Sequence, residues 1–170
     1  NVDLAEKEKI LCHKINAFAL EVIARVAHKI DALVIHFSTD YVFDGLKQKP
    51  YIETDITNPI NEYGKSKLSG ELFLKKHNDK NIIIRTSWVF SNYRKNFFNT
   101  ILNKIKTNNC ISVVNDQIGS PTSSDLISKM VRLIISKYVQ NRVLPYGTFN
   151  ISSKGETTWY KFAKEIISKN

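Results

Sequence analysis

The chain has 170 residues, of which 42% are hydrophobic and 24% are charged, an ordinary composition for one soluble globular domain. This composition excludes the disordered and collagen-like classes. No apolar run approaches the roughly 18 residues that a membrane span needs, and the N-terminus lacks the basic start and apolar stretch of a signal peptide. We therefore expect a cytoplasmic protein with no membrane partner.

The formal net charge is +9, from 25 Lys and Arg against 16 Asp and Glu. Clustered cations bind nucleic-acid phosphates, but the clusters here are small, Lys75-Lys76 and Lys104-Ile105-Lys106. We interpret the charge mainly as solvated surface, with an anionic small-molecule substrate as the alternative, and expect no nucleic-acid partner. Cys12 and Cys110 match neither CxxC nor a metal-binding spacing, so we expect two reduced core thiols, no disulfide and no metal set.

Apolar residues from Ile10 to Ala27 keep a helical spacing, and the apolar run Leu33–Phe37 then predicts a buried strand. Such alternation of helices and apolar strands is typical of a parallel α/β sheet. The same criteria predict a helix opening at Asn58-Pro59 and ending near His77, a strand at Asn81–Thr86, a helix near Asn96–Lys106, a strand at Ile111–Val114, a helix near Ser124–Lys137, a strand at Thr148–Ile151 and a helix from about Thr158.

Tyr63 and Lys67 lie four residues apart, so both side chains are on one helix face. A free tyrosine has a pKa near roughly 10, and an adjacent ammonium lowers that pKa and brings proton exchange toward neutral pH. The pair suits carbonyl reduction: Tyr63 donates a proton as a hydride arrives, and Lys67 can hold ribose hydroxyls of the cofactor. The alternative is a structural helix in which Tyr63 packs an edge and Lys67 is solvated.

Ligands of open α/β sheets bind beyond the carboxyl ends of the strands, which directs attention to residues 38–41 and 87–90. There a Thr39 hydroxyl could polarise a substrate carbonyl, although a turn or helix cap is the alternative role.

Four segments resemble the dTDP-4-dehydrorhamnose reductase family of extended short-chain dehydrogenase/reductases: residues 36–43, 61–71, 85–90 and 115–122. The resemblance runs from Val2 to Tyr160. It implies a partial Rossmann-like, doubly wound parallel sheet, with a catalytic part over residues 1–114 and part of a nucleotide-sugar-binding lobe over residues 115–170. It also implies an NADP-dependent oxidoreductase that reduces dTDP-4-dehydro-L-rhamnose to dTDP-L-rhamnose for bacterial surface polysaccharides such as the O-antigen of lipopolysaccharide.

The resemblance assigns a role to each matching residue. Tyr63, Lys67 and Thr39 match the catalytic triad, with Tyr63 and Lys67 also touching the cofactor. The residues matching substrate-binding positions are Thr39, Asp40, Tyr41 and Trp88. Asn16 matches a helix asparagine near the active site, with a simple polar helix residue as the alternative. Gln117, Gly119 and Thr122 match the loop that enters the nucleotide-sugar lobe. Arg85 also lies in a matching segment and could equally be a structural ion-pair residue. NADPH is the implied cofactor, and NADH, Mg²⁺ and a homodimer are compatible with the family.

None of the six glycines forms the G-x-G-x-x-G pattern that binds a cofactor pyrophosphate. We therefore expect a fragment truncated at both ends, without the first βαβ half, with an exposed apolar sheet edge and weak cofactor binding. Two alternatives remain: a non-catalytic relative resembling the regulatory subunit of methionine adenosyltransferase, and an epimerase or another reductase acting on a nucleotide sugar.

Overall fold

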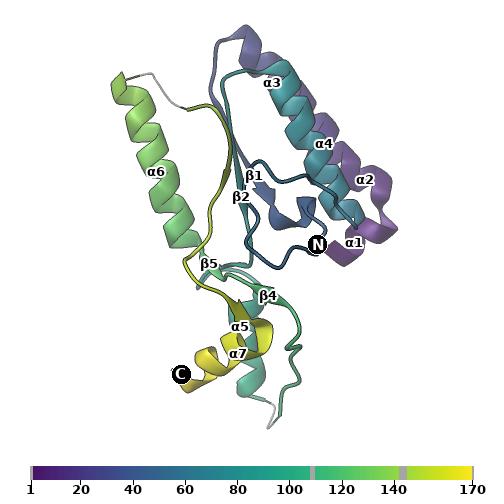
Figure 1. The fold of residues 1–170 in the computed structure, drawn as a ribbon, viewed down its shortest axis with the longest axis vertical. Coiled ribbons are helices and arrows are strands. Elements are labelled where there is room, and N and C mark those ends of the chain that lie inside the picture. The colour runs from purple at the N-terminus through teal and green to yellow at the C-terminus, as the bar shows by residue number, and fades with distance from the viewer. Residues whose placement is uncertain (1, 108–109, 142–144, 170) are drawn as a thin grey trace. The chain divides into compact units, whose positions relative to one another are not determined.

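Three parallel strands form the main sheet in the order β1-β2-β6: β1 is Val34–Thr39, β2 is Asn81–Thr86 and β6 is Gly147–Asn150 (Figure 1). The computed structural model describes residues 2–107, 110–141 and 145–169. The predicted parallel α/β architecture is confirmed, and the three strands of this sheet lie within a few residues of their predicted positions. Of the helices described, none is both long and apolar enough to cross a membrane.

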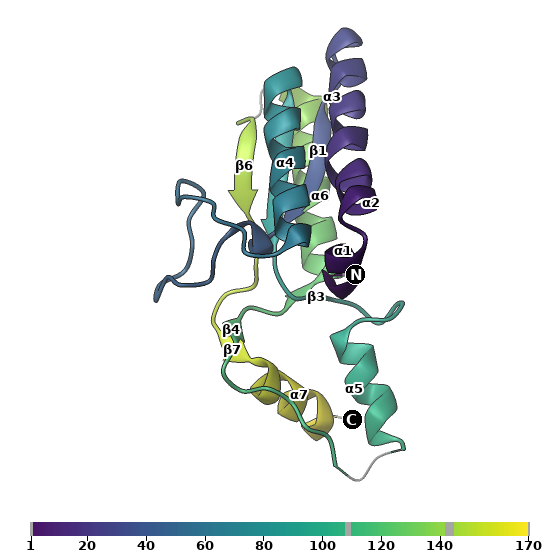
Figure 2. The same ribbon diagram turned by 90° about the vertical axis from the view of Figure 1, so that its right-hand side faces the viewer.

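The helices before β1 form a nearly unbroken run that includes one π-helical segment. Helices α3 (Ala19–Lys29) and α4 (Glu62–His77) lie side by side along the sheet (Figure 2), and the core of this part contains Leu20, Ala24, Leu74 and Ile83, with Val34 packed against them. The elements are α1 (Val2–Lys7), α2 (Lys9–His13), the π-helix η1 (Lys14–Phe18), α3 (Ala19–Lys29) and α4 (Glu62–His77).

Helix α4 begins later than predicted. Its N-cap is Asn61, whose side chain accepts a 2.7 Å hydrogen bond from the Gly64 amide. The predicted start at Asn58-Pro59 is wrong. The side-chain amide of Asn58 does not cap the helix but donates to Asp44 Oδ2 at 3.2 Å, which holds the preceding loop. The difference places Tyr63 in the first turn of the helix.

One side of this α/β part leaves apolar surface uncovered. Among the described residues β1 pairs only with β2, and Phe37 on β1 is 47% exposed. Helices α2 and α3 with η1 add exposed apolar side chains at helical spacing, namely Leu11, Ile15, Phe18, Val22, Ile23, Val26 and Ile30. The expected exposed apolar edge is therefore confirmed for the described chain.

The remaining elements build a second, smaller core. Helices α5 (Phe97–Ile105) and α7 (Trp159–Ser168) meet through Ile101, Ala163 and Ile166. The other elements are α6 (Ser124–Asn141) and two strand pairs, parallel β3 (Val89–Phe90) with β5 (Thr122–Ser123) and antiparallel β4 (Ile118–Gly119) with β7 (Thr157–Thr158).

The predicted strand Ile111–Val114 is wrong. This segment is unpaired chain whose Ile111 and Val113 side chains pack on the second core, while the Val114 carbonyl accepts a 3.0 Å hydrogen bond from the Tyr160 amide. The side chains of an apolar run of this length can be buried against helices as well as in a sheet.

The chain divides into two compact units. Unit 1 comprises Asn1–Thr86 and Pro145–Asn150, and unit 2 comprises Ser87–Leu144 and Ile151–Asn170. Packing thus divides the chain after residue 86 rather than at the predicted boundary, residue 114. Segment 145–150 belongs to unit 1 because it returns to add β6 to the sheet. The functional division at residue 114 stays a prediction.

Candidate active site

The carboxyl end of β1 turns directly into a single 3-10 turn, η2 (Asp40–Val42), which is held by the buried Thr39. The Thr39 hydroxyl accepts from the Tyr41 amide at 3.2 Å and donates to Asp40 Oδ1 at 3.0 Å. The turn therefore gathers a hydroxyl, a carboxyl and a phenol where ligands of parallel sheets bind. Burial is the main cause that raises the pKa of Asp40, and its hydrogen bond from Thr39 opposes the shift.

Helix α4 docks its first turn on this site through a glycine. A Cβ at Gly64 would lie 2.1 Å from the Tyr41 carbonyl oxygen, so a larger residue cannot occupy position 64 without moving the backbone. This contact brings the Tyr63 ring to 5.8 Å from the Tyr41 ring, with their planes at 80°. The structure thus brings together the predicted residues Thr39, Asp40, Tyr41 and Tyr63.

Tyr63 holds its proton more tightly than a free tyrosine. Burial is the main cause that raises its pKa, the charge of Asp40 raises it further, and a hydrogen bond with the Thr39 side chain opposes both. The expectation that Lys67 lowers this pKa is wrong, because the Lys67 ammonium points to other partners. At neutral pH Tyr63 is therefore a protonated phenol, able to donate.

Lys67 is only 8% exposed and is fixed by β1. Its ammonium donates to the Phe37 carbonyl at 2.6 Å and lies 3.1 Å from His36 Nε2. Burial lowers the pKa of Lys67, with the charge of Glu71 opposing, and burial together with the Lys67 charge lowers the pKa of His36 to about 4. A neutral His36 can therefore accept a hydrogen bond from Lys67 at pH 7.

Sequence reasoning missed His36. The available signal was a single polar residue inside the apolar run Leu33–Phe37, on the strand that leads into the Thr39 turn.

A second polar cluster lies behind Tyr63. Ser66 is fully buried, and its hydroxyl donates to the Tyr63 carbonyl at 2.7 Å. Ser66 has one proton, so it accepts from Asn16 Nδ2 at 3.0 Å and from the Cys12 thiol at 3.0 Å. Asn16 therefore contacts helix α4 rather than being an isolated polar residue, while Cys110 is exposed, contrary to its prediction as a core thiol.

The π-helical segment also approaches α4 closely. A Cβ at Gly70 would lie 2.2 Å from the Asn16 carbonyl oxygen, so this helix pair, like the start of α4, depends on a glycine. Neither glycine was singled out from the sequence.

Arg85 has a structural role. Its Nε and Nη2 atoms donate to the two Glu71 carboxylate oxygens at 2.9 and 2.6 Å, and both side chains are buried. This bidentate pair clamps α4 to β2. The alternative that Arg85 is a structural ion-pair residue accounts for its contacts.

Trp88 belongs to unit 2 and stacks on Trp159, with ring centroids 3.6 Å apart and planes at 11°. Gly119 leaves room for this ring, since a Cβ there would lie 2.5 Å from it. Gln117 Oε1 accepts from Trp159 Nε1 at 3.1 Å, and the Thr122 amide donates to the Trp88 carbonyl at 3.2 Å. The Gln117–Thr122 loop thus supports the tryptophan pair, and substrate binding by Trp88 stays a prediction.

The residues fit one end of a nicotinamide cofactor. Lys67 has three N–H donors and uses two, which leaves one for a ribose hydroxyl next to Tyr63. No glycine-rich phosphate cradle and no group of three potential metal ligands occurs in the part of the chain that the structure describes. The described residues therefore fit the ribose end of the cofactor.

Comparison with known proteins finds relatives over almost the whole chain. The dTDP-4-dehydrorhamnose reductase of Sinorhizobium fredii is 42% identical over 168 residues, covering 98% of this chain and 57% of that protein. The Escherichia coli enzyme of the same name is 41% identical, covering 99% and 56%. A crystal structure of the Bacillus anthracis dTDP-4-dehydrorhamnose reductase in complex with NADP superposes with a TM-score of 0.92 at 40% identity, covering 99% of this chain and 58% of that one.

The chain thus spans a little over half the length of the relatives it matches. The family model of the RmlD substrate binding domain matches residues 1–170. Because that match extends over the whole sequence, the chain belongs to the RmlD substrate binding domain family.

Proposed function

We propose that this chain supplies the catalytic residues for NADPH-dependent reduction of dTDP-4-dehydro-L-rhamnose to dTDP-L-rhamnose. The product would serve bacterial surface polysaccharide synthesis, including the O-antigen of lipopolysaccharide. The observation that carries the proposal is the placement of a protonated Tyr63 beside Thr39 and Asp40 at the carboxyl end of β1. Relatives at about 40% identity that are named for this reaction support the substrate.

The site residues suit proton donation to a ketone oxygen. Tyr63 would give its phenolic proton to the oxygen at C4, and the Thr39 hydroxyl would turn its single proton from Asp40 Oδ1 to the same oxygen. NADPH supplies the hydride to C4 when bound. The C=O bond then becomes CH–OH with one hydride and one proton added, and Tyr63 recovers its proton from solvent.

Asp40 and Lys67 would act beside this transfer. The negative charge of Asp40 disfavours the phenolate of Tyr63, so it favours reprotonation of Tyr63 after the transfer. Lys67 would hold a ribose hydroxyl with its third N–H, while His36 and the Phe37 carbonyl fix its position. Tyr41 and Trp88 would lie against the sugar.

The NADP complex of the Bacillus anthracis relative supports NADPH as the cofactor over NADH. A cytoplasmic location completes the proposal, and a homodimer and Mg²⁺ are compatible with it through the family resemblance.

The test is oxidation of NADPH, followed by its absorbance, with dTDP-4-dehydro-L-rhamnose as substrate, comparing this chain with Tyr63→Phe. We expect turnover to fall at least about 100-fold in the variant, since general-acid catalysis contributes roughly 10²–10⁴. Tyr93→Phe is the matched control, because it removes the hydroxyl of an exposed tyrosine that belongs to no proposed site. Equal turnover by Tyr63→Phe and the unaltered chain would contradict the assigned role, and a folded chain without turnover would favour the non-catalytic alternative.

A further inference from the structure

The positive charge of the chain is concentrated in unit 2. Unit 1 contains thirteen Lys and Arg against twelve Asp and Glu, whereas unit 2 contains twelve Lys and Arg against four Asp and Glu. A local excess of this size attracts anions.

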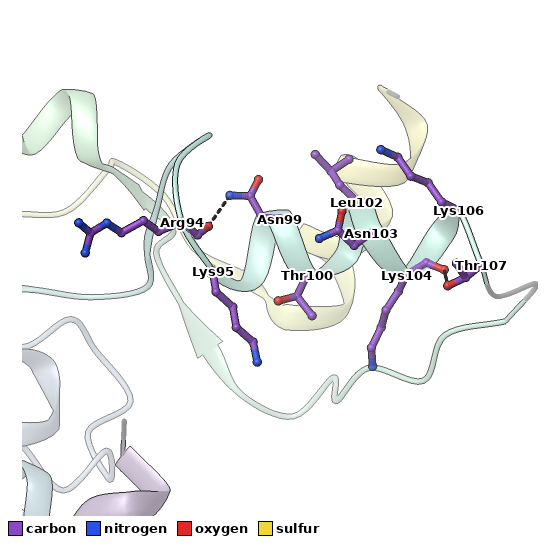
Figure 3. A pocket seen from close by; sticks show the side chains of 9 residues that line it. All are labelled: Arg94, Lys95, Asn99, Thr100, Leu102, Asn103, Lys104, Lys106 and Thr107. Carbon is purple, nitrogen blue, oxygen red and sulfur yellow. Dashed lines mark hydrogen bonds between the residues drawn. The ribbon is translucent and has the colours of Figure 1, made fainter.

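Part of this charge lines a pocket of about 820 Å³ along α5, within the range of small-molecule sites. Figure 3 shows Lys95, Thr100 and Lys104 extending on the same side of the helix. The nine lining residues include four cations and no acid: Arg94, Lys95, Asn99, Thr100, Leu102, Asn103, Lys104, Lys106 and Thr107.

The cations of this pocket are not neutralised by the protein. Within residues 2–107, 110–141 and 145–169, no ion pair involves Arg94, Lys95, Lys104 or Lys106. Two neutral side chains of the pocket are already engaged, since the Thr100 hydroxyl donates to the Asn96 carbonyl at 2.7 Å and the Asn99 amide donates to the Ser91 and Arg94 carbonyls. The four cations are exposed to solvent and can donate to an anionic acceptor.

The pocket is built on fixed elements. The Asn99 amide donates to the carbonyls of Ser91 and Arg94 at 3.1 and 2.7 Å, which ties the loop carrying Arg94 and Lys95 to α5 (Figure 3). Helix α5 itself is anchored by Ile101, which is 3% exposed in the core shared with α7. The cations thus extend from a scaffold that does not need to be ordered by a ligand.

We propose that this pocket binds a small anion carrying two or more phosphate groups, with Lys95 and Lys104 as its main contacts. The nine residues of α5 span roughly 13 Å, which exceeds one phosphate group and suits a chain of linked phosphates. The lining contains no aromatic side chain on which a base could stack, which favours recognition of the phosphates over single-stranded nucleic acid. None of the residues of the candidate active site lines this pocket.

The test is calorimetric titration of the chain with pyrophosphate, tripolyphosphate, dTDP and orthophosphate at low salt. The variant Lys95→Gln with Lys104→Gln is compared with Lys129→Gln plus Lys137→Gln, which removes the same charge from exposed positions of α6 in the same unit. We expect pyrophosphate to bind the unaltered chain more tightly than orthophosphate. The pocket variant should weaken it by about tenfold or more, the effect of losing a charged hydrogen bond, and the α6 variant by less than about twofold.

Several outcomes would overturn the proposal. Equal weakening of pyrophosphate binding in both variants would mean that the overall positive charge of unit 2, rather than the pocket, attracts anions. Tighter binding of an oligothymidylate than of pyrophosphate would assign the surface to nucleic acid, and dTDP that pyrophosphate cannot displace would show recognition of the nucleoside instead. Because binding is measured without NADPH or the keto sugar, the result does not depend on the proposed reductase activity.

Discussion

Unit 1 carries nearly balanced charge and buries several of its polar groups, whereas unit 2 carries a large excess of cations that face solvent. In unit 1 the ionisable side chains bind one another, as in the Arg85–Glu71 pair and the Lys67–His36 contact. In unit 2 the pocket cations Lys95 and Lys104 lack a protein carboxylate among the described residues. Burial is therefore the main cause of the pKa shifts of His36, Asp40, Tyr63 and Lys67 in unit 1, whereas the pocket cations of unit 2 are exposed to external anions.

This difference teaches where substitutions act. A buried group of unit 1 has partners that lose their hydrogen bonds with it, so its removal affects folding. An exposed cation of unit 2 has water as its partner, so its removal affects binding and changes stability by less than about 0.5 kcal/mol. The predictions below test this contrast.

The largest effect is expected at Glu71. Glu71→Leu leaves Arg85 buried without its partner and should lower the free energy of unfolding by about 3–5 kcal/mol, measured by urea denaturation. The double variant Glu71→Leu with Arg85→Met removes both charges and should be less destabilised than Glu71→Leu alone. Lys104→Gln in unit 2 is the control. A double variant worse than the single one would mean that the pair contributes attraction beyond its burial cost.

The next effect is expected at Gly64. In Gly64→Ala the new Cβ meets a backbone carbonyl, which cannot rotate away, so we expect a loss of about 3 kcal/mol in the same measurement. Gly45→Ala is the matched control: its φ is 77°, yet nothing lies within 4 Å of the added Cβ, so only the left-handed conformation costs about 1 kcal/mol. Similar losses in the two variants would show that the contact with Tyr41 does not hold the start of α4.

The sequence predicted the parts of this fold that depend on local pattern. The apolar runs near β1 and β2 were sufficient for the parallel sheet, and a four-residue spacing was sufficient to place Tyr63 and Lys67 on one helix face. The helix predicted to open at Asn58 is instead capped by Asn61, and the backbone of Gly64 in its first turn lies against the Tyr41 carbonyl. That contact joins segments more than 20 residues apart, so no local pattern contains it.

The partners of the site residues were hidden for the same reason. Lys67 meets His36 across 31 residues and Ser66 meets Cys12 across 54, and neither separation carries a periodicity that a reader of the sequence can detect. The direction of the Tyr63 pKa was misjudged because it depends on burial and on Asp40, which only the folded chain brings to it.

A pH-dependent effect is expected at His36. Its pKa is about 4 in the folded chain and about 6.5 when unfolded, so the unfolded chain binds more protons between these values and stability falls as pH drops from 6.5 toward 4. The difference between the two pKa values corresponds to a loss of at most about 3 kcal/mol in the free energy of unfolding. His36→Gln keeps an acceptor for Lys67 without the titrating ring, and its unfolding free energy should change less between pH 6.5 and 4 than that of the unaltered chain. Parallel pH curves for the two proteins would contradict the assignment.

The smallest effect is expected at Ser66, and it separates the cluster behind Tyr63 from general packing. Ser66→Ala removes the group that joins Asn16, Cys12 and the Tyr63 carbonyl, which should cost about 1–2 kcal/mol. Ser69→Ala, on the same helix, removes a hydroxyl that bonds only to the Lys65 carbonyl and should cost less than about 0.5 kcal/mol. In a Cys110→Ser background, Cys12 is the remaining thiol, and its reaction with a disulfide reagent should be faster in Ser66→Ala than in Ser69→Ala. Unchanged Cys12 reactivity would mean that packing, rather than the Ser66 hydroxyl, protects the thiol. The polar contacts that stabilise unit 1 would then not include this cluster.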